Sequence, residues 1–305
     1  MPPSVTNAQL TKLLGDLTSD RSRTTYGTFS ELAAYGAFAE SGLPLKIQVP
    51  MSGTDILNPN GSDLDGEVEL NNEILFDVKG FGLHEYLIGE LVTRLTVDLA
   101  PDVVAAEGSW DVSISTVETL LGSPGYDTLR AELAAGPHAR ARRSGLEFVR
   151  KPKRPIQIDV SSTDPYRAAE EHADYAFRFA KQFPRHQPFL LVFVFHPWMG
   201  GLGRHVNFDG FTDTFLRAFA RRTFLQFRND RTNTHCGMPR ADASRLLSGM
   251  LFLDAWQDDP RPADLAAARL FLNPNAARPL TGLDRDAFRF ADFDATIEDF
   301  RHDDY

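Results

Sequence analysis

The feature that most constrains the fold of this chain is the run FLLVFVF at residues 189–195, in which every side chain is apolar. A strand with one face in solvent alternates polar and apolar side chains, so a strand that is apolar throughout indicates burial on both faces. The run is far too short to span a bilayer, which takes about 20 apolar residues in a helix. We therefore expect a central strand in a sheet with helices on both sides.

Local patterns place further strands and helices around this run. Residues 28–41 predict a helix, because Thr28 and Glu31 form a T-x-x-E capping box and Gly42 follows as a stop signal. The other expected elements include strands at 45–50, 66–70, 74–81 and 110–115, with those at 66–70 and 74–81 joined as a hairpin, and helices at 83–99, 166–182, 211–228 and 241–257. Their order indicates an α/β fold in which helices cover a mixed sheet.

The length of the chain indicates either one large domain or a core with a substantial extension. The chain has 305 residues, of which 42% are hydrophobic and 24% charged, and this balance suits a globular core better than a disordered chain. We expect residues 1–199 to form the core, with a basic β-hairpin inserted at about 140–161, and residues 200–305 to form a mainly helical extension.

Cysteine usage, the N-terminus and the net charge narrow the class of function. The single cysteine, Cys236, excludes an intramolecular disulfide framework and a Cys-rich zinc site. The N-terminus carries no secretory signal, so we expect a cytoplasmic protein without a membrane partner. The net charge of −10 argues against a protein that coats nucleic acid, but it is compatible with an enzyme that has a local basic patch.

One acidic segment carries a pattern with chemical meaning, DLDGEVELNNEILFDVK at 63–79. Alternate side chains of a strand share a face, so we expect Asp77 and Lys79 to project together. The hairpin can bring either Asp65 or Asp63 from the preceding strand beside Asp77. Two carboxylates from adjacent strands, completed by the backbone carbonyl of Val78, suit Mg²⁺, which takes oxygen ligands and keeps several waters.

This pattern resembles the PD-(D/E)xK nuclease superfamily, which includes many restriction endonucleases, resolvases and defence nucleases. The shared features are the S-D-L-D entry to a hairpin, the D-V-K strand at Lys79, and Glu31 in the preceding helix, where many such enzymes carry a supporting acidic ligand. Ser52-Gly53 before the acidic loop is similar to the Holliday-junction resolvase branch. The resemblance covers roughly residues 28–99. No proline precedes Asp63, and D-x-K stands where E-x-K is commoner.

The resemblance implies a restriction-endonuclease-like fold and metal-dependent hydrolysis of phosphodiester bonds, with DNA favoured over RNA and a role in restriction or antiviral defence. Mg²⁺ is the expected cofactor, with Mn²⁺ as an alternative, and it would activate a water molecule at the scissile phosphate. Lys79 would orient that water or help to deprotonate it. The implied catalytic residues are Lys79, Asp77, Asp65 and Glu31, and the implied metal ligands are Asp65, Asp77, Asp63, Val78 and Glu31.

Each of these residues also has a structural interpretation. Asp77 and Lys79 would be an inert surface ion pair if their strand lay at a sheet edge, although the flanking apolar residues favour a central strand. Of the two candidate aspartates, Asp65 is preferred because it opens the strand, and Asp63 fits the P-D-hydrophobic pattern of the family almost as well. Glu31 is explained as well by the capping box as by the site.

A basic run is the candidate contact with nucleic acid. Seven basic residues and one acid, Glu147, lie between positions 140 and 154. Such side chains neutralise phosphates without reading sequence, whereas the structural interpretation is a solvated hairpin whose charges prevent edge-to-edge aggregation. The candidates for nucleic-acid binding are Ser52, Arg140, Arg142, Arg143, Arg150, Lys151, Lys153 and Arg154. For Ser52 the alternative is a turn.

Two classes of function remain open from the sequence. The first is the active nuclease. The second is a catalytically idle nuclease-like module that binds nucleic acid or a partner protein in a multiprotein complex. The intact set of two aspartates and a lysine favours the first class. A homodimer or a partner in a defence complex is compatible with both, and no sequence feature establishes either.

Overall fold

The structure is a computed structural model that describes residues 7–18, 22–40, 42–81, 83–108, 114–153, 165–171, 173–195, 208–254, 268–282 and 296–300. The chain forms two units. The core unit contains Met1–Phe81, Asp164–Pro197 and Asp209–Tyr305, and the insert unit contains Gly82–Thr163 and Trp198–Phe208. This division differs from the expected boundary at residue 199, because the chain leaves the core unit after Phe81 and returns to it at Asp164.

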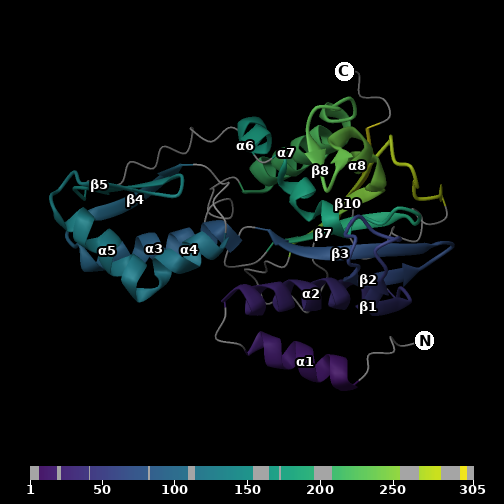
Figure 1. Ribbon diagram of the computed structural model, residues 1–305, viewed down its shortest axis with the longest axis horizontal. Coiled ribbons are helices and arrows are strands. Elements are labelled where there is room, and N and C mark those ends of the chain that lie inside the picture. The colour runs from purple at the N-terminus through teal and green to yellow at the C-terminus, as the bar shows by residue number, and fades with distance from the viewer. Residues whose placement is uncertain are drawn as a thin grey trace. The chain divides into compact units, whose positions relative to one another are not determined.

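Among the described residues, a seven-stranded mixed sheet forms the centre of the core unit (Figure 1). In spatial order its strands are β1 (Leu45–Met51), β2 (Ser62–Glu69), β3 (Glu73–Phe81), β7 (Phe189–Phe195), β10 (Gly249–Asp254), β11 (Ala268–Leu272) and β12 (Thr296–Asp299). Strands β3, β7 and β10 run parallel, whereas β2 is antiparallel to β1 and β3, and β11 is antiparallel to β10. The expected α/β class with a mixed sheet flanked by helices is confirmed.

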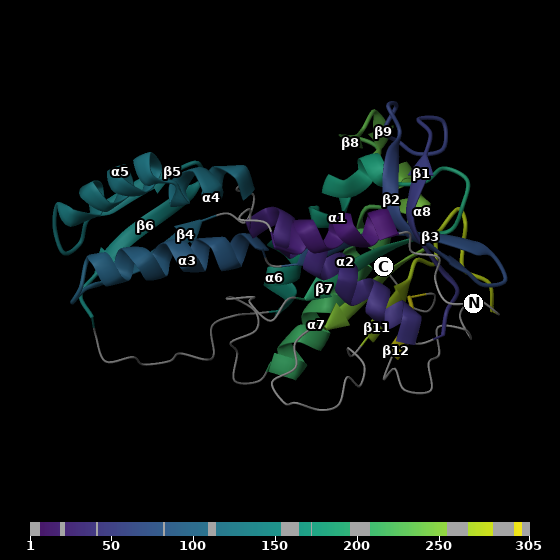
Figure 2. The same ribbon diagram turned by 90° about the horizontal axis from the view of Figure 1, so that it is seen from below.

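Helices lie on both sides of this sheet. The remaining elements of the core unit are α1 (Asn7–Leu17), α2 (Ser22–Glu40), α6 (Pro165–Glu171), the 3-10 helix η1 (Tyr175–Gln182), α7 (Phe208–Arg221), the π-helical turn η3 (Arg222–Gln226), β8 (Thr234–His235), β9 (Met238–Pro239) and α8 (Arg240–Leu246). Figure 1 shows α1 and α2 below the sheet and α7 and α8 above it, and Figure 2 views α1 and α2 from their own side. None of the described helices has both the length and the apolar character to cross a membrane.

Strand β7 is covered on both faces, as its apolar sequence predicts. Residues 189–194 expose at most 1% of their surface. Val192 belongs to the core cluster on the side of α2, together with Phe38. Phe193 points to the other layer, where its ring centroid lies 5.9 Å from that of Phe219 in α7. Aromatic residues such as Phe219 therefore contribute a second layer, and residues 189–194 are buried between the two layers.

Helix α2 covers the face of the sheet that carries Phe76. The ring centroids of Phe38 and Tyr35 lie 4.8 and 6.4 Å from that of Phe76. Further along β3, Gly80 allows a close approach, because a Cβ atom at this position would lie 2.1 Å from a ring carbon of Tyr26. The glycine therefore sets how closely the first half of α2 approaches β3.

Gly80→Ala is expected to destabilise the fold by about 1–3 kcal/mol, the usual range for overpacking, because Tyr26 is buried at 3% exposure and has little room to move. The control is Gly36→Ala in α2. Gly36 is exposed and an added Cβ there meets nothing within 4 Å, so alanine should stabilise the helix by about 0.5–1 kcal/mol. Urea unfolding measures both changes. Wild-type stability in Gly80→Ala would show that α2 is not packed this closely on β3.

Two sequence predictions about helices are wrong. Helix α2 begins at Ser22, so Thr28 lies in its interior and does not form an N-cap with Glu31. The helix expected at 241–257 ends at Leu246, and residues 249–254 form β10 instead. A short apolar run such as GMLFL has no periodicity that separates a buried strand from a buried helix.

In the described residues, the C-terminal part of the chain is not a mainly helical extension. Helix α7 and the turn η3 correspond to the helix expected at 211–228, but β10, β11 and β12 belong to the same sheet as β3. Strand β10 pairs with β7 along its whole length, from Gly249 to Asp254. The sheet of the core unit therefore takes strands from both halves of the sequence.

The insert unit combines helices with a small antiparallel sheet. Its described elements are α3 (Leu83–Asp98), β4 (Val103–Gly108), α4 (Ile114–Leu121), α5 (Ser123–Ala134), β5 (Arg140–Arg143) and β6 (Leu146–Lys151), and the sheet order is β4-β6-β5. The β5–β6 hairpin turns at Ser144 and Gly145, whose φ angles are 49° and 93°. The hairpin expected at about 140–161 is thus present over 140–151, and residues 154–161 lie outside the described part.

Candidate active site

Asp77 and Lys79 lie on β3, which has a neighbouring strand on each side. Lys79 Nζ is 2.5 Å from Asp77 Oδ2, the Asp77 side chain is fully buried, and the Lys79 side chain is 17% exposed. The interpretation as a surface pair on an edge strand is therefore wrong. Taking two charges out of water has a desolvation cost that their attraction often does not recover, so this placement needs a reason beyond stability.

Asp65 from β2 extends the pair into a cluster. The regular ladder between β2 and β3 ends at Gly66 and Phe76. Beyond that point the Asp65 side chain reaches across to β3, where its Oδ2 accepts a hydrogen bond of 2.6 Å from the Val78 N–H. A carboxylate thus takes the place of a backbone acceptor. The carboxylate of Asp65 therefore contacts Val78, the residue between Asp77 and Lys79 in the sequence.

Asp63 and Ser52 have other surroundings. Asp63 is exposed, whereas Asp65 makes the contact to β3, so the geometry favours Asp65 over Asp63 as a ligand. Ser52 Oγ donates to Asp55 Oδ2 at 2.5 Å and lies 2.6 Å from Thr54 Oγ1. These local hydrogen bonds are typical of a turn, which was the alternative interpretation of Ser52.

Glu31 contributes a third carboxyl group from α2. It lies in the helix interior, so no capping role explains it. Burial raises the pKa of Glu31 to about 7, the negative charge of Asp65 adds to the rise, and the ammonium of Lys79 opposes it. Glu31 is therefore coupled to both residues, and it exchanges its proton near neutral pH.

The cluster sets three carboxyl groups against one ammonium. Burial raises the pKa of Asp77 well above its ordinary value, and the charge of Lys79 only partly offsets this rise. Burial alone would lower the pKa of Lys79, but the three surrounding acids outweigh it and raise that pKa. Lys79 therefore stays an ammonium, whereas Glu31 and Asp77, whose pKa values are raised, hold their protons more tightly than free carboxyl groups do. Clusters with such perturbed pKa values are concentrated at functional sites.

Glu31→Gln is expected to leave stability nearly unchanged at about pH 4 and to raise it at about pH 8. The pKa of Glu31 in the folded state, about 7, lies above the ordinary 4.5, so the folded state binds this proton more tightly than the unfolded state. The resulting stability is fully present below about 4.5 and is lost as the pH rises through about 7, whereas glutamine resembles the protonated form throughout. Thermal unfolding across this range measures the difference. A gap between the two proteins that stays constant with pH would speak against a perturbed carboxyl group.

Three residues that no sequence pattern singles out complete the site. Burial raises the pKa of Tyr35, so its hydroxyl stays protonated and donates a hydrogen bond of 2.9 Å to the backbone oxygen of Asp65. Gln48 of β1 forms a side-chain hydrogen bond with Tyr35 and has a left-handed backbone with φ 55°. The Phe179 ring of η1 lies beside Lys79, 5.3 Å from Nζ to the ring centroid. A strained residue next to an acidic cluster is a further mark of a functional site.

The donor atoms of the cluster fit a hard divalent cation. Both carboxyl oxygens of Asp77 are buried without a hydrogen-bond donor among the described residues, apart from the ion pair with Lys79, and Asp65 presents a second carboxylate from the neighbouring strand. No group of three or more His, Cys, Asp or Glu side chains in the described part is arranged to hold a metal ion. Two carboxylates with waters in the other positions are compatible with Mg²⁺. Glu31 and the Val78 carbonyl as ligands stay predictions.

Most of the expected nucleic-acid contacts in the basic run form ion pairs within the insert unit. Arg140 and Arg142 pair with Glu147 at 3.2 and 3.1 Å, Arg143 pairs with Glu132, Arg150 pairs with Asp102 at 2.8 Å, and Lys151 pairs with Glu107 at 2.8 Å. Lys153 is exposed, and Arg154 lies outside the described residues. Ion pairs with neighbouring acids therefore account for most of these basic side chains, and contact of the basic run with nucleic acid stays a prediction.

Comparison with known proteins identifies no relative. No protein-family model, curated protein or solved structure gives a significant match to the chain. The interpretation of the site therefore depends on its own geometry and on the D…D-x-K pattern.

Proposed function

We propose that this chain is a metal-dependent nuclease of the PD-(D/E)xK type that hydrolyses phosphodiester bonds, with DNA as the favoured substrate. The observation that carries the proposal is the buried Asp77–Lys79 pair with Asp65 beside it. Apolar residues of similar volume would pack at this place without the desolvation cost of charged groups, so folding alone does not explain the cluster. Metal-assisted hydrolysis of phosphodiesters uses these same groups.

The order of elements supports the same proposal. The helix that carries Glu31 precedes β1, the β2–β3 hairpin carries Asp65 and Asp77, and α3 follows the strand that carries the lysine. This is the succession that the family resemblance implies, namely helix, strand, acidic hairpin, D-x-K strand and helix. The central position of β3 in a mixed sheet is compatible with a restriction-endonuclease-like fold.

The chemistry divides between the cation and the side chains. Mg²⁺ bound at the two aspartates would polarise the scissile phosphate and lower the pKa of a bound water. The acids around Lys79 raise its pKa, so it keeps its proton, orients the water and offsets negative charge in the transition state, and it is a poor base. Glu31, with a pKa of about 7, is better matched to accept a proton near neutral pH.

Cleavage assays test the proposal. The purified chain is incubated with supercoiled plasmid, linear duplex, single-stranded DNA, RNA and a four-way junction, each with Mg²⁺, with Mn²⁺ and with excess EDTA. We expect DNA to be cut when a divalent cation is present and to stay intact with EDTA. A melting temperature that rises with Mg²⁺ while every substrate stays intact would favour the idle module. If neither cleavage nor a rise occurs, the assignment of a metal site is wrong.

A further inference from the structure

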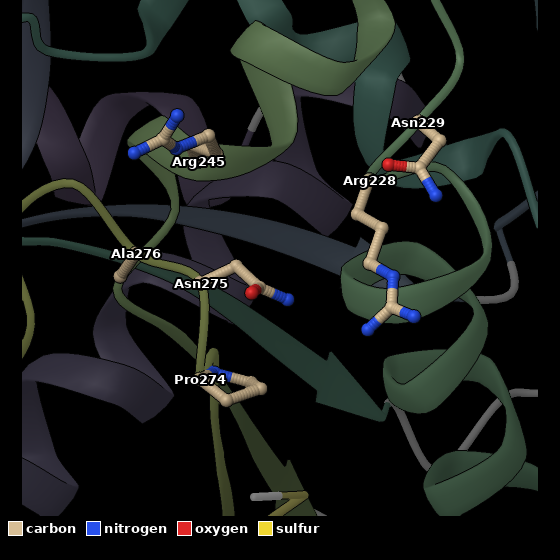
Figure 3. A pocket seen from close by; sticks show the side chains of 6 residues that line it. All are labelled: Arg228, Asn229, Arg245, Pro274, Asn275 and Ala276. Carbon is tan, nitrogen blue, oxygen red and sulfur yellow. The ribbon is translucent and has the colours of Figure 1, made fainter. Parts of the chain in front are cut away.

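A polar pocket lies in the core unit, away in sequence from the residues of the candidate active site, and the proposed chemistry uses none of its lining residues. It has a volume of about 470 Å³ and is lined by Arg228, Asn229, Arg245, Pro274, Asn275 and Ala276 (Figure 3). The lining residues come from the turn after η3, from the end of α8 and from the turn after β11. None of these six residues is acidic.

Two arginines give this pocket an uncompensated positive charge. Arg228 and Arg245 are both exposed, and neither guanidinium belongs to an ion pair within the described part of the chain. By contrast, the arginines of the preceding helical segment are engaged: Arg217 pairs with Glu298 at 2.6 Å, and Arg222 lies 3.9 Å from Glu170.

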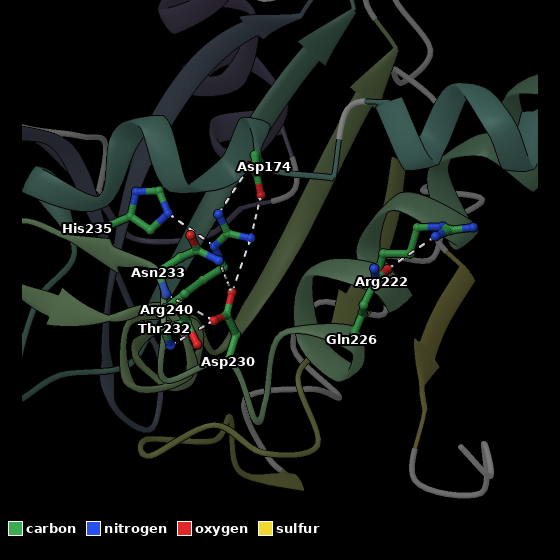
Figure 4. Close-up of polar contacts among 8 residues, drawn as sticks. All are labelled: Asp174, Arg222, Gln226, Asp230, Thr232, Asn233, His235 and Arg240. Carbon is green, nitrogen blue, oxygen red and sulfur yellow. Dashed lines mark hydrogen bonds and ion pairs between the residues drawn. The ribbon is translucent and has the colours of Figure 1, made fainter.

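The acids closest to the pocket in sequence are occupied elsewhere. Asp230 accepts hydrogen bonds from the backbone N–H groups of Thr232 and Asn233, both at 3.1 Å, and lies 3.4 Å from Arg240 (Figure 4). Asp242 forms an ion pair of 2.5 Å with Arg231. These contacts shape the turn that carries Arg228 and leave its charge without a counter-ion.

Asn275 adds a donor that lacks an acceptor. Its amide nitrogen Nδ2 is buried and makes no hydrogen bond within the described part of the chain. Figure 3 shows this nitrogen on the side of the pocket from which Arg228 projects. A buried donor without an acceptor is unfavourable, and native proteins keep such groups rare, so Nδ2 is suited to donate a hydrogen bond to an acceptor atom of a ligand.

The scaffold of the pocket is rigid. Asn273, only 3% exposed, donates through its side-chain amide to the backbone oxygens of Ser244 and Leu247, both at 2.8 Å. Its Oδ1 accepts a hydrogen bond of 2.9 Å from the N–H of Asn275. The turn after β11 is thereby tied to the end of α8, so Asn275 and Arg245 are held in a fixed relation without a ligand.

We propose that this pocket binds a phosphate group. Two guanidinium groups can donate charge-assisted hydrogen bonds to an oxyanion, and Asn275 Nδ2 can donate a third, neutral one. A cation is disfavoured because both charged groups that line the pocket are themselves cations. The phosphate belongs either to the backbone of a nucleic acid or to a small phosphorylated molecule. The inference does not depend on nuclease activity, because the pocket shares no residue with the candidate active site.

Binding of inorganic phosphate tests the pocket directly. Calorimetry and thermal unfolding are carried out with phosphate and with chloride at equal ionic strength. We expect phosphate to raise the melting temperature of the wild type, and Arg228→Ala or Arg245→Ala to weaken its Kd by about tenfold or more, since each removes a charge-assisted hydrogen bond. Arg231→Ala is the matched control, because it removes the same charge from an arginine that Asp242 already neutralises. Equal weakening in all three variants, or in none, would overturn the proposal.

Asn275→Asp is expected to raise the melting temperature in the absence of a ligand. The new carboxylate would supply the missing counter-ion, so we expect a higher melting temperature without phosphate and no further rise when phosphate is added. A melting temperature that still responds to phosphate would place its binding elsewhere.

A labelled DNA oligonucleotide distinguishes the two sources of phosphate. If the oligonucleotide binds, if free phosphate competes with it, and if Arg228→Ala weakens it as much as it weakens phosphate, the pocket holds a nucleic-acid backbone. If phosphate binding depends on Arg228 while oligonucleotide binding does not, the ligand is a small phosphorylated molecule. Phosphate binding that depends on neither arginine would refute the site.

Discussion

Asp77→Asn should abolish Mg²⁺-dependent cleavage while the chain remains folded, with a loss in kcat of at least about 10²–10³-fold, the range for removing one preorganised electrostatic group. Asparagine keeps the shape of the side chain and removes its charge. The substitution would therefore delete a ligand of the proposed cation without opening a cavity in the sheet, where Asp77 is fully buried on β3. The loss is measured with the DNA substrate that the wild type cuts best, and circular dichroism verifies the fold.

The matched control for this change is Asp63→Asn. Asp63 lies on β2, two residues before Asp65, and is exposed, so its replacement should leave cleavage near the wild-type rate. Mg²⁺ should also raise the melting temperature of the wild type and of Asp63→Asn but not that of Asp77→Asn, because a ligand stabilises only the state that binds it. Cleavage by Asp77→Asn, or equal losses in both variants, would remove Asp77 from the site.

Lys79→Met is expected to have the largest effect on stability. It removes the counter-ion of a fully buried carboxylate, and such a change typically costs about 3–5 kcal/mol. The loss should depend on pH. Without Lys79 the pKa of Asp77 rises further, and a group whose folded-state pKa is raised contributes stability that is lost as the pH increases. Lys79→Met should therefore be much less stable than the wild type at about pH 8 and closer to it at about pH 5.

A double-mutant cycle isolates the interaction between these two residues. Asp77→Asn combined with Lys79→Met removes both charges, so it should recover much of the stability that Lys79→Met alone loses at about pH 8. Urea unfolding of the four proteins at both pH values provides the coupling energy. Additive effects would mean that the two groups do not depend on each other, contrary to the contact of 2.5 Å.

Local patterns in the sequence predicted the parts of the fold that local physics controls. The uniformly apolar run at 189–195 predicted a strand buried on both faces, and the period of two along β3 placed Asp77 and Lys79 together. Strand β10 was mistaken for a helix because a short apolar run carries no periodicity. The expected mainly helical extension was wrong for the described residues, because β10, β11 and β12 belong to the sheet of the core unit.

The composition of the candidate site could be predicted only in part, because its contacts are not local. Asp63 and Asp65 are two residues apart in β2, so the alternation of side chains places both on the same face and does not distinguish them. Only the end of the regular β2–β3 pairing at Gly66 allows the Asp65 side chain to reach the backbone of β3. Gln48 carries no signal in sequence, since its left-handed backbone interrupts the β1–β2 ladder and its hydrogen bond is to Tyr35, a residue of another element. The sequence also offered Glu31 a role in a capping box at Thr28, but the helix begins at Ser22 and this role is absent.

The parallel pairing of β3 with β7 has a consequence for when the chemistry becomes available. Strand β7 follows residues 82–163 of the insert unit in the chain, so during synthesis β3 emerges with one edge open well before the strand that pairs with that edge. In that interval we expect Asp77 to be hydrated, so that burial does not raise its pKa. We expect the proposed nuclease activity to begin only after the ribosome has delivered residues 189–195, which form β7.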